Sequence, residues 1–382
     1  MFLRSFPYKD RRGRMFLYIE VSPVLSMGND ESDPKLRVDQ KELESFAFEI
    51  LTAAGVTKHH ARTVADALVR ADLRGVDSHG LARLEIYVRK FENGGFNPDP
   101  NVRIESIADT AVLVDADDGP GQSAATRAIE EAMAMAGDSG IGIAGVTNSN
   151  HFGTAAYYTE KASDAGYVGL AMTNVVSGVA PFGGTDAFLG TNPISFSIPT
   201  DREYPITLDM ATSVVAMGKV DHVAEAGDQL PDDWALDENG EPATSPEEVE
   251  ALRPVGGPKG FGLGLVVDAL CGVLTGAGTS ETVGELYDDF DKPMRLGHFV
   301  AAIDVDSFRG EETFRQEMGL YIDRLKSQDT QDGVDEIRVP GELETLEKQR
   351  NETAGVPVNA DAQRGLRNLA ERFDIPLPDG FE

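Results

Sequence analysis

The feature that most constrains the fold of this chain is a set of short apolar runs that alternate with helical segments between residues 102 and 220. Each run has the length of a strand and is bounded by turn-forming residues. Helical patterns near residues 121–136, 153–165 and 212–220 separate the runs. The runs are VRIESI, TAVLVDA, IGIAGV, YVGLAMTN, ISFSIP and PITLDM. Strands that alternate with helices in this way predict an α/β fold with a central sheet.

Helical patterns precede this sheet region. One begins at Asp39, a second follows through residues 58–74, and a third is expected from an N-cap at Ser78. Each pattern ends at a glycine, which suits the left-handed conformation at a helix C-terminus. The N-terminal part of the chain is therefore expected to form a small helical unit.

Further elements follow the sheet region. We expect an apolar helix over residues 262–274, a strand from Phe299, a long helix near residues 311–327 and then two polar helices. Residues 228–252 carry nine acidic side chains and no basic one. That composition, together with the turn residues ENGEP, predicts an exposed excursion rather than core.

The chain is strongly acidic. It has 65 Asp and Glu against 34 Lys and Arg, which gives a formal net charge of -31. We therefore expect neither a basic surface that binds nucleic acid nor attraction to anionic membranes. The acids are spread along the chain, which indicates adaptation to a salt-rich, halophilic cytoplasm where salt screens their repulsion. The first 26 residues carry +3 and the rest -34. This basic segment is expected to be an extension or tail, or to precede a native start at Met27.

The chain contains one cysteine, Cys271, which lies in an apolar run. A disulfide framework and a cysteine-based metal site are therefore excluded, and an intracellular, cytoplasmic setting is expected. No stretch reaches the roughly 18 uninterrupted apolar residues that a membrane span needs.

Gly140, Gly142 and Gly145 match the string G-x-G-x-x-G of dinucleotide-binding folds. That motif must leave a strand and open a helix, so that the pyrophosphate meets the helix N-terminus. Here a helical segment precedes the glycines and a strand follows them. We therefore interpret Gly140 as a helix stop and expect no phosphate site at this motif.

Two histidines lie in sequence contexts that suit chemistry. His79 is followed at spacings of four and eight by Arg83 and Tyr87, which a helix would place on one face. An imidazole can move a proton near neutral pH, and a guanidinium can bind a carboxylate through two hydrogen bonds. This trio suits an acid substrate with a reacting oxygen, although an ordinary polar helix surface would have the same pattern.

His151 lies in the segment TNSNHFG, where a predicted strand ends and a helix begins. Ligands bind at such ends of α/β sheets, although a loop histidine that only satisfies a backbone group is an equal alternative. Asp209 also ends a strand and can cap a helix or bind a hydroxyl. Lys259 places a cation beside a helix start, or is simply solvated. The other four histidines, His59, His60, His222 and His298, are expected to be structural.

Several motifs in this order resemble the malate/L-lactate dehydrogenase family of the sulfolactate dehydrogenase type. That family includes ureidoglycolate and 2,3-diketo-L-gulonate dehydrogenases and some cyclic imine reductases. The resemblance extends from about Val38 to near the C-terminus. It depends on RADLRGVDSHGLARLEIY, NSNHFGTAAYY, VAPFGG, GTNP, LDMATS, GKV, GPKGFGL and RVPGE.

The resemblance implies an NAD-dependent, or alternatively NADP-dependent, oxidoreductase that transfers hydride between the nicotinamide and a 2-hydroxy or 2-oxo acid, with malate or L-lactate as candidates. It implies a non-Rossmann, mixed-sheet dinucleotide-binding domain over residues 111–309. A helical domain over residues 38–110 is completed by residues 310–382, residues 1–37 are an extension, and the molecule is a homodimer.

The resemblance also implies the site residues. His79 and His151 match histidines that donate or accept the proton, and Ser78, Arg83 and Tyr87 match substrate-binding positions. Dinucleotide contacts are implied at Asp209, Met210, Ala211, Lys259, Gly341 and Glu342. No metal is implied. At Val175 a polar cofactor contact found in some members is expected to be absent.

Three alternatives remain open at this point. A cyclic imine acid could replace the 2-oxo acid as the substrate in the same family. A metal-dependent lyase or isomerase could use His79, His151 and Asp209 as ligands, because two imidazoles and a carboxylate can bind a cation. A dinucleotide-binding module without catalysis is the third.

Overall fold

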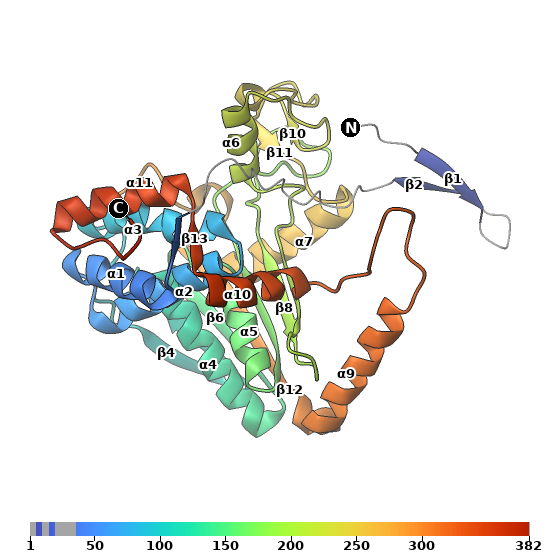
Figure 1. Ribbon diagram of the computed structural model, residues 1–382, viewed down its shortest axis with the longest axis horizontal. Helices are drawn as coiled ribbons and strands as arrows, with labels where there is room; N and C mark the ends of the chain where they lie inside the picture. The colour runs from blue at the N-terminus through green and yellow to red at the C-terminus, as the bar shows by residue number, and fades with distance from the viewer. Residues whose placement is uncertain (1–4, 10–14, 20–35, 382) are drawn as a thin grey trace. The chain divides into compact units, whose positions relative to one another are not determined.

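The computed structural model describes residues 5–9, 15–19 and 36–381. The chain divides into two compact units, Met1–Lys35 and Leu36–Glu382. In the first unit, strand β1 (Ser5–Lys9) pairs antiparallel with β2 (Met15–Ile19). Met27, the expected native start, lies outside the described residues. All further description concerns the second unit, whose elements are labelled in Figure 1.

A seven-stranded mixed sheet forms the centre of the second unit, in the order β4-β5-β6-β12-β7-β8-β9. Only β5 and β6 run parallel, and every other neighbouring pair is antiparallel. The strands are β4 (Arg103–Ala108), β5 (Ala111–Asp115), β6 (Ile141–Ser149), β7 (Tyr167–Thr173), β8 (Ile194–Ile198), β9 (Ile206–Met210) and β12 (Leu296–Asp304). All six apolar runs that the sequence analysis interpreted as strands are strands, and the α/β prediction is confirmed.

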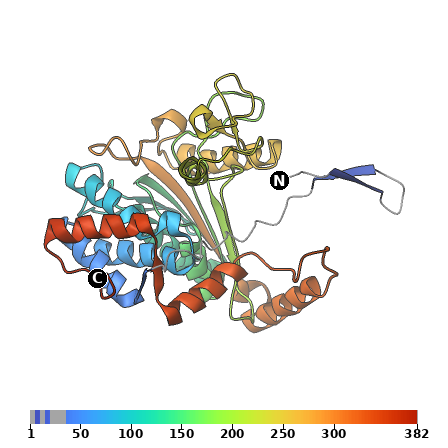
Figure 2. The ribbon, with the colours of Figure 1, turned by 45° about the horizontal axis from the view of Figure 1, so that its top comes forward.

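Helices cover both faces of this sheet. Helices α4 (Gly121–Ser139) and α5 (Ala156–Asp164) pack on one face, and α7 (Pro258–Asp268) with the π-helical turn η4 (Ala269–Val273) packs on the other (Figure 2). Small side chains bring α4 close to the sheet, since a Cβ atom at Gly142 would overlap the Ala132 carbonyl oxygen. Gly140 ends α4 in the left-handed conformation, with φ 83°. The prediction that this glycine stops a helix is confirmed.

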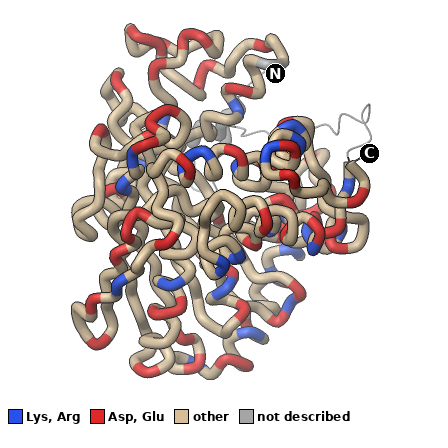
Figure 3. The backbone as a smooth tube through the Cα atoms, turned by 90° about the vertical axis from the view of Figure 1, so that its left-hand side faces the viewer, with Lys and Arg blue, Asp and Glu red and all other residues tan. Residues whose placement is uncertain are grey.

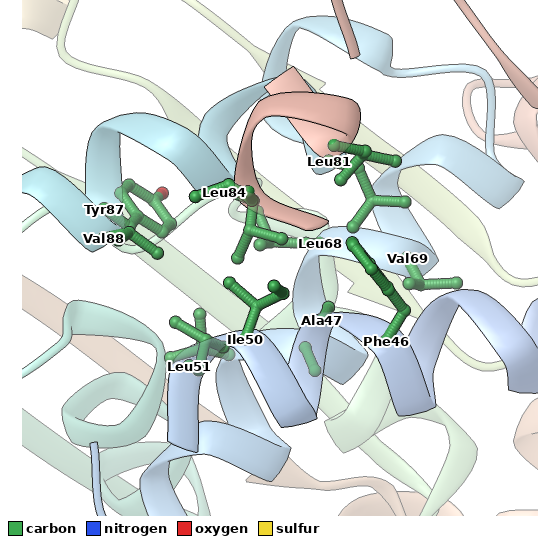
Figure 4. Packing of buried hydrophobic residues seen from close by; sticks show 14 of the residues in the cluster. Phe46, Ala47, Ile50, Leu51, Leu68, Val69, Leu81, Leu84, Tyr87 and Val88 are labelled. Carbon is green, nitrogen blue, oxygen red and sulfur yellow. The ribbon is translucent and has the colours of Figure 1, made fainter. Parts of the chain in front are cut away.

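A helical layer lies beside the sheet. It contains α1 (Gln40–Ala53), α2 (Lys58–Leu73), α3 (Leu84–Asn93) and α11 (Ala360–Phe373). A short pair of strands, β3 (Leu36–Val38) and β13 (Val356–Val358), joins its two ends. The apolar faces of these four helices form one buried cluster. Figure 4 shows Tyr87 next to Leu84 and Val88 of α3, in the same cluster as aliphatic side chains of α1 and α2.

The segment expected to be an exposed excursion has a core of its own, so that prediction was wrong in part. Residues 228–252 contain strands β10 (Ala235–Leu236) and β11 (Ala251–Leu252), which pair with each other, and the turn η3 (Pro246–Glu248). Leu230, Ala235, Ala243 and Leu252 are buried against Val179 and Leu189. The acids dominate the composition, but the apolar residues between them face inward. The helix expected over 212–220 is displaced and forms α6 (Met217–Ala226).

The C-terminal part begins with α8 (Val305–Arg309) and α9 (Glu311–Lys326), the predicted long helix. Arg315 donates to the Thr200 carbonyl at 3.0 Å, and Arg202 donates to the Gly319 carbonyl at 3.1 Å, so α9 is attached to the loop that follows β8. Helix α10 (Glu342–Ala354) follows a long connection, and the turn η5 (Ser280–Thr282) precedes β12.

Acidic residues lie along the whole backbone of the second unit, with basic residues between them (Figure 3). None of the helices in the described part of the chain is long and apolar enough to cross a membrane.

Candidate active site

The segment around His79 is not the continuous helix that the sequence predicted. Two short 3-10 turns, η1 (Asp77–His79) and η2 (Leu81–Arg83), precede α3, which begins only at Leu84. The cause is the buried carboxylate of Asp72, which accepts a hydrogen bond from the Leu81 backbone N–H at 2.8 Å. A Cβ atom at Gly80 would overlap this carboxylate. The chain therefore bends around Asp72 instead of entering a helix at Ser78.

This bend separates the predicted trio. The Arg83 Nε donates to the Ser78 carbonyl at 2.6 Å, and the guanidinium lies 5.3 Å from the centre of the Tyr287 ring. Tyr87 is buried and its hydroxyl lies 2.6 Å from Nδ1 of His151. His79, Arg83 and Tyr87 do not form one helix face, because His79 and Arg83 lie in 3-10 turns. Ser78 is exposed, and its Oγ lies 2.9 Å from Nδ1 of His79.

His151 follows the end of β6, and its loop is held from several sides. The buried Asn150 side chain donates to the Asp118 carbonyl at 2.6 Å and accepts from the Met294 N–H at 2.8 Å. The rings of His79 and His151 are stacked, with 5.6 Å between their centres and 24° between their planes. The two candidate histidines, 72 positions apart in the sequence (151 minus 79), thus lie face to face.

Burial governs the protonation of both histidines. Burial, and after it the nearby charge of Arg83, lowers the pKa of His79 to about 4. The pKa of His151 lies well below its usual value, first through burial and then through His79, Arg83 and His298. Burial raises the pKa of the Tyr87 hydroxyl. Both imidazoles are therefore neutral at pH 7.

Asp209 connects the His151 loop to the edge of the sheet. It lies near the end of β9, and its Oδ2 accepts the Ala156 N–H, the first of α5, at 2.7 Å. It thus bonds the start of α5, which lies earlier in the chain, and not the helix that was expected to follow it, while Oδ1 has no hydrogen-bond partner among the described residues. Met210 and Ala211 continue from it. The backbone carbonyl of the next residue, Thr212, accepts the Val255 N–H at 2.9 Å. The loop before α7 therefore lies beside the segment that follows Asp209.

Lys259 is exposed in the first turn of α7, a helix that begins at Pro258 without a side-chain cap. Pro258 has no N–H group, and the N–H groups of Gly260 and Phe261 donate to the Val255 and Gly257 carbonyls at 2.9 and 3.1 Å. The positive end of the helix dipole and the charge of Lys259 remain to favour an anion there. Gly341 lies against β9, because the Thr207 N–H donates to the Pro340 carbonyl at 2.9 Å. A Cβ atom at Gly341, where φ is 85°, would lie 2.8 Å from Thr207 Cβ.

Glu342 differs from the other expected cofactor residues. Its side chain is buried, Oε1 pairs with Lys326, and Oε2 accepts the Val339 N–H at 3.1 Å. Both carboxylate oxygens therefore have partners within the chain. At Val175 the backbone N–H donates to Asn192 at 3.0 Å, and the side chain is apolar as expected.

His298, one of the four histidines expected to be structural, lies close to His151. His298 is buried, and both ring nitrogens lie 2.8 Å from hydroxyls, those of Thr173 and Ser149. Burial lowers its pKa to about 3. Its ring stacks on that of Phe152, the residue after His151, with 4.6 Å between the ring centres.

Cys271 is buried with a free thiol.

The metal-dependent alternative requires three ligands at one point. Among the described residues, no three His, Cys, Asp or Glu side chains lie close enough together to hold an ion. His79, His151 and Asp209 consequently do not form the cation site on which this alternative depends.

Sequence reasoning missed several residues that shape the site. Gln122 in α4 donates to the Tyr87 hydroxyl at 3.0 Å, and Tyr287 covers Arg83. Glu160 in α5 forms a buried ion pair with Arg74, the residue that follows α2, and lies 3.3 Å from Arg70. Asp72 was missed as well, because Arg70 and Arg74 flank it in the sequence and make it resemble an ordinary surface acid.

Comparison with known proteins gives a consistent result. The family model described as malate/L-lactate dehydrogenase matches residues 38–367. A malate dehydrogenase of Pyrococcus horikoshii is 38% identical over 350 residues, 89% of this chain and 96% of that protein. A ureidoglycolate dehydrogenase (NAD(+)) of Escherichia coli is 34% identical over 331 residues, 87% and 95% of the two chains.

Solved structures agree. The malate dehydrogenase of Entamoeba histolytica superposes with a TM-score of 0.86 at 29% identity, over 90% of this chain and 99% of that one. The sulfolactate dehydrogenase of Methanocaldococcus jannaschii superposes with a TM-score of 0.84 at 30% identity, over 91% and 100% of the two chains.

Proposed function

The chain belongs to the malate/L-lactate dehydrogenase family, and from this premise we propose that it is an oxidoreductase that transfers hydride between NAD or NADP and a 2-hydroxy or 2-oxo acid. Malate and L-lactate are the substrates we propose first. The observation that carries the proposal is the stacked pair of neutral histidines, His79 and His151, beside the guanidinium of Arg83. A proton carrier next to a carboxylate-binding cation is what reduction of a 2-oxo acid requires.

The dinucleotide is proposed to lie along the end of β9 and the start of α7. Three observations fit it: the uncapped α7 N-terminus with Lys259 for a phosphate, Asp209 Oδ1 for a hydroxyl, and the backbone of Met210 and Ala211. The backbone of Gly341 and Glu342 is proposed to complete the site, since the Glu342 carboxylate is already engaged. When bound, the nicotinamide supplies or accepts the hydride.

We propose a non-Rossmann dinucleotide domain over residues 111–309, with a helical domain made of residues 38–110 and 310–382. The mixed strand order and the role of Gly140 as a helix stop support the first part. The buried cluster shared by α1, α2, α3 and α11 supports the second. A cytoplasmic location in a salt-rich cell belongs to the same proposal, supported by the free Cys271 and the acidic composition.

The residues of the chain have separate tasks in this reaction. Arg83 and Ser78 bind the substrate carboxylate, and Tyr87 acts through its hydrogen bond to His151. In the direction of reduction, one of the two histidines gives a proton to the carbonyl oxygen. In the direction of oxidation, the neutral imidazole takes the proton from the hydroxyl group. The field of a chain with net charge -31 repels the substrate, so binding depends on the local cation Arg83.

The molecule is proposed to act as a homodimer. Helix α7 is apolar on all sides. Four apolar side chains are nevertheless exposed in the single chain: Leu265 and Val266 in α7, and Val273 and Leu274 shortly after it. A helix of this kind is normally covered, and a second copy is the proposed cover. Sedimentation in molar KCl should give twice the chain mass of 41.1 kDa, and Leu274→Glu should shift the protein toward the monomer. A monomeric unmodified protein contradicts the proposal.

The function is tested by the oxidation of NADH and NADPH against a panel of substrates in molar KCl. The panel contains pyruvate, oxaloacetate, sulfopyruvate and a cyclic imine acid. We expect turnover with at least one 2-oxo acid, and we expect Arg83→Lys to raise KM for that acid at least tenfold, because lysine cannot form the paired hydrogen bonds. Turnover with the imine alone would move the assignment to the reductase branch, and no turnover with any substrate refutes the dehydrogenase.

A further inference from the structure

The hydrogen bonds behind His151 determine which ring nitrogen carries its proton. The backbone N–H of Gly153 points at Nδ1 over 3.4 Å. A backbone N–H can only donate, so Nδ1 has to be the acceptor. In a neutral imidazole the other nitrogen, Nε2, then holds the hydrogen.

Tyr87 and Gln122 extend this arrangement. The Tyr87 hydroxyl lies 2.6 Å from the same Nδ1 and therefore donates to it. The oxygen of that hydroxyl accepts a hydrogen bond from Nε2 of Gln122 at 3.0 Å. Gln122 and Tyr87 are each about 1% exposed, so water does not compete for these bonds. The Gln122 and Tyr87 donors thus point in one direction, from α4 through α3 to His151.

The other ring nitrogen of His151, Nε2, donates to no acceptor among the described residues. The His79 ring stacks over the plane of the His151 ring. The charged or titratable groups around His151 are His79 from η1, Arg83 from η2, Tyr87 from α3 and His298 from β12. None of them is a carboxylate that could stabilise an imidazolium.

His79 is bound differently. Its Nδ1 has one partner, the hydroxyl of Ser78, which can either donate or accept. Ser78 is exposed, so a proton can pass between His79 and solvent. Nδ1 of His151 has no such route, because its partners are the Gly153 N–H and the buried Tyr87 hydroxyl. Burial raises the pKa of that hydroxyl, which opposes the loss of its proton.

We propose that the two histidines divide the work: His151 is a neutral hydrogen-bond donor that polarises the reacting oxygen through Nε2–H, and His79 moves the proton. Gln122 is the positioning residue that holds His151 in this state through Tyr87. A neutral imidazole can stabilise a developing oxyanion without changing its protonation. As the carbonyl carbon gains hydride, its oxygen gains a proton from the His79 imidazolium, which becomes neutral, and the N–H bond of His151 stays intact. The chemical role rests on the proposed function, whereas the tautomer does not.

The tautomer can be measured without substrate. Long-range ¹H–¹⁵N correlation spectra of histidine-labelled protein distinguish a protonated from an unprotonated ring nitrogen, and the spectrum of His151→Gln assigns the signals. We expect His151 to show unprotonated Nδ1 and protonated Nε2 between pH 6 and pH 9, a range set around the usual histidine pKa of about 6.5. A protonated Nδ1, or an imidazolium at pH 7, overturns the proposal.

Two variants of the positioning residue extend the test. In Gln122→Glu the carboxylate accepts from Tyr87, which frees Nδ1 of its strongest donor, so both tautomers should appear and kcat should fall about 10- to 100-fold. Gln122→Met removes the donor without adding charge and should show a smaller change in the same direction. An unchanged tautomer in both variants removes Gln122 from the proposal. Loss of all turnover in an unmodified protein that keeps the Nε2–H signal would count against the proposed function alone.

Discussion

Replacing His79 by alanine is expected to lower kcat for the 2-oxo acid about 10²- to 10⁴-fold, the usual contribution of a general acid or base. Within the described part of the chain, Nε2 of His79 has no hydrogen-bond partner, and Nδ1 is connected to solvent through the exposed Ser78. In the free protein, burial and then Arg83 lower the pKa of His79 to about 4. A carboxylate bound at Arg83 offsets the second cause, so substrate binding should raise the pKa of His79 toward its usual value.

The sign of the pH dependence follows. Reduction needs the protonated histidine, so kcat/KM for the 2-oxo acid should fall as pH rises above this pKa. Oxidation needs the neutral histidine, so kcat/KM for the 2-hydroxy acid should rise with pH over the same range. His59→Ala, at an exposed position on α2, is the matched control and should leave both profiles unchanged. Full turnover in His79→Ala together with loss of turnover in His151→Ala would reduce His79 to an orienting role.

The substitution Glu160→Gln is expected to lower the free energy of unfolding by about 3–5 kcal/mol. Glu160 is 3% exposed and pairs with Arg74, which directly follows α2 and is 6% exposed, so the helical layer is attached to α5 on the sheet through a buried ion pair. Removing the carboxylate charge leaves Arg74 buried without its ion-pair partner. Urea denaturation followed by circular dichroism in molar KCl measures the effect.

The matched control is Glu130→Gln, which removes the same charge from an exposed pair. Glu130 lies 2.9 Å from Lys161, and both side chains are more than a third exposed. Such pairs contribute about 0–1 kcal/mol. Equal effects of the two substitutions would mean that the Arg74–Glu160 pair is solvated in solution and does not join the layers.

Local patterns predicted the elements of the fold well. Each of the six strands could be recognised from the apolar composition of a few consecutive residues. Gly140 could be recognised as a helix stop because the sequence shows a helix before it and a strand after it. The acidic segment 228–252 was misjudged because composition averages over residues that face opposite ways. Its few apolar side chains find partners at Val179 and Leu189, far away in the sequence.

The sequence indicated His79 and His151 as candidates, but it did not predict the geometry around them. His79 and His151 were chosen for their residue type and position at element ends, and the structure places them together. The spacing of His79, Arg83 and Tyr87 suggested a shared face, but the buried carboxylate of Asp72 changes the backbone there. Gln122 lies 35 positions from Tyr87, and no local pattern in either segment indicates their contact.

The central claim is a hydride transfer to the substrate carbon, and isotope labelling tests it most directly. The protein would be incubated with a 2-oxo acid and NADH or NADPH that carries deuterium at the transferable position of C4, and the hydroxy acid would be analysed by mass spectrometry. We expect one deuterium at C2 of the product, and about 10²- to 10⁴-fold less of this labelled product when His79→Ala is used over the same time. A product without deuterium, formed by the unmodified protein, would contradict it.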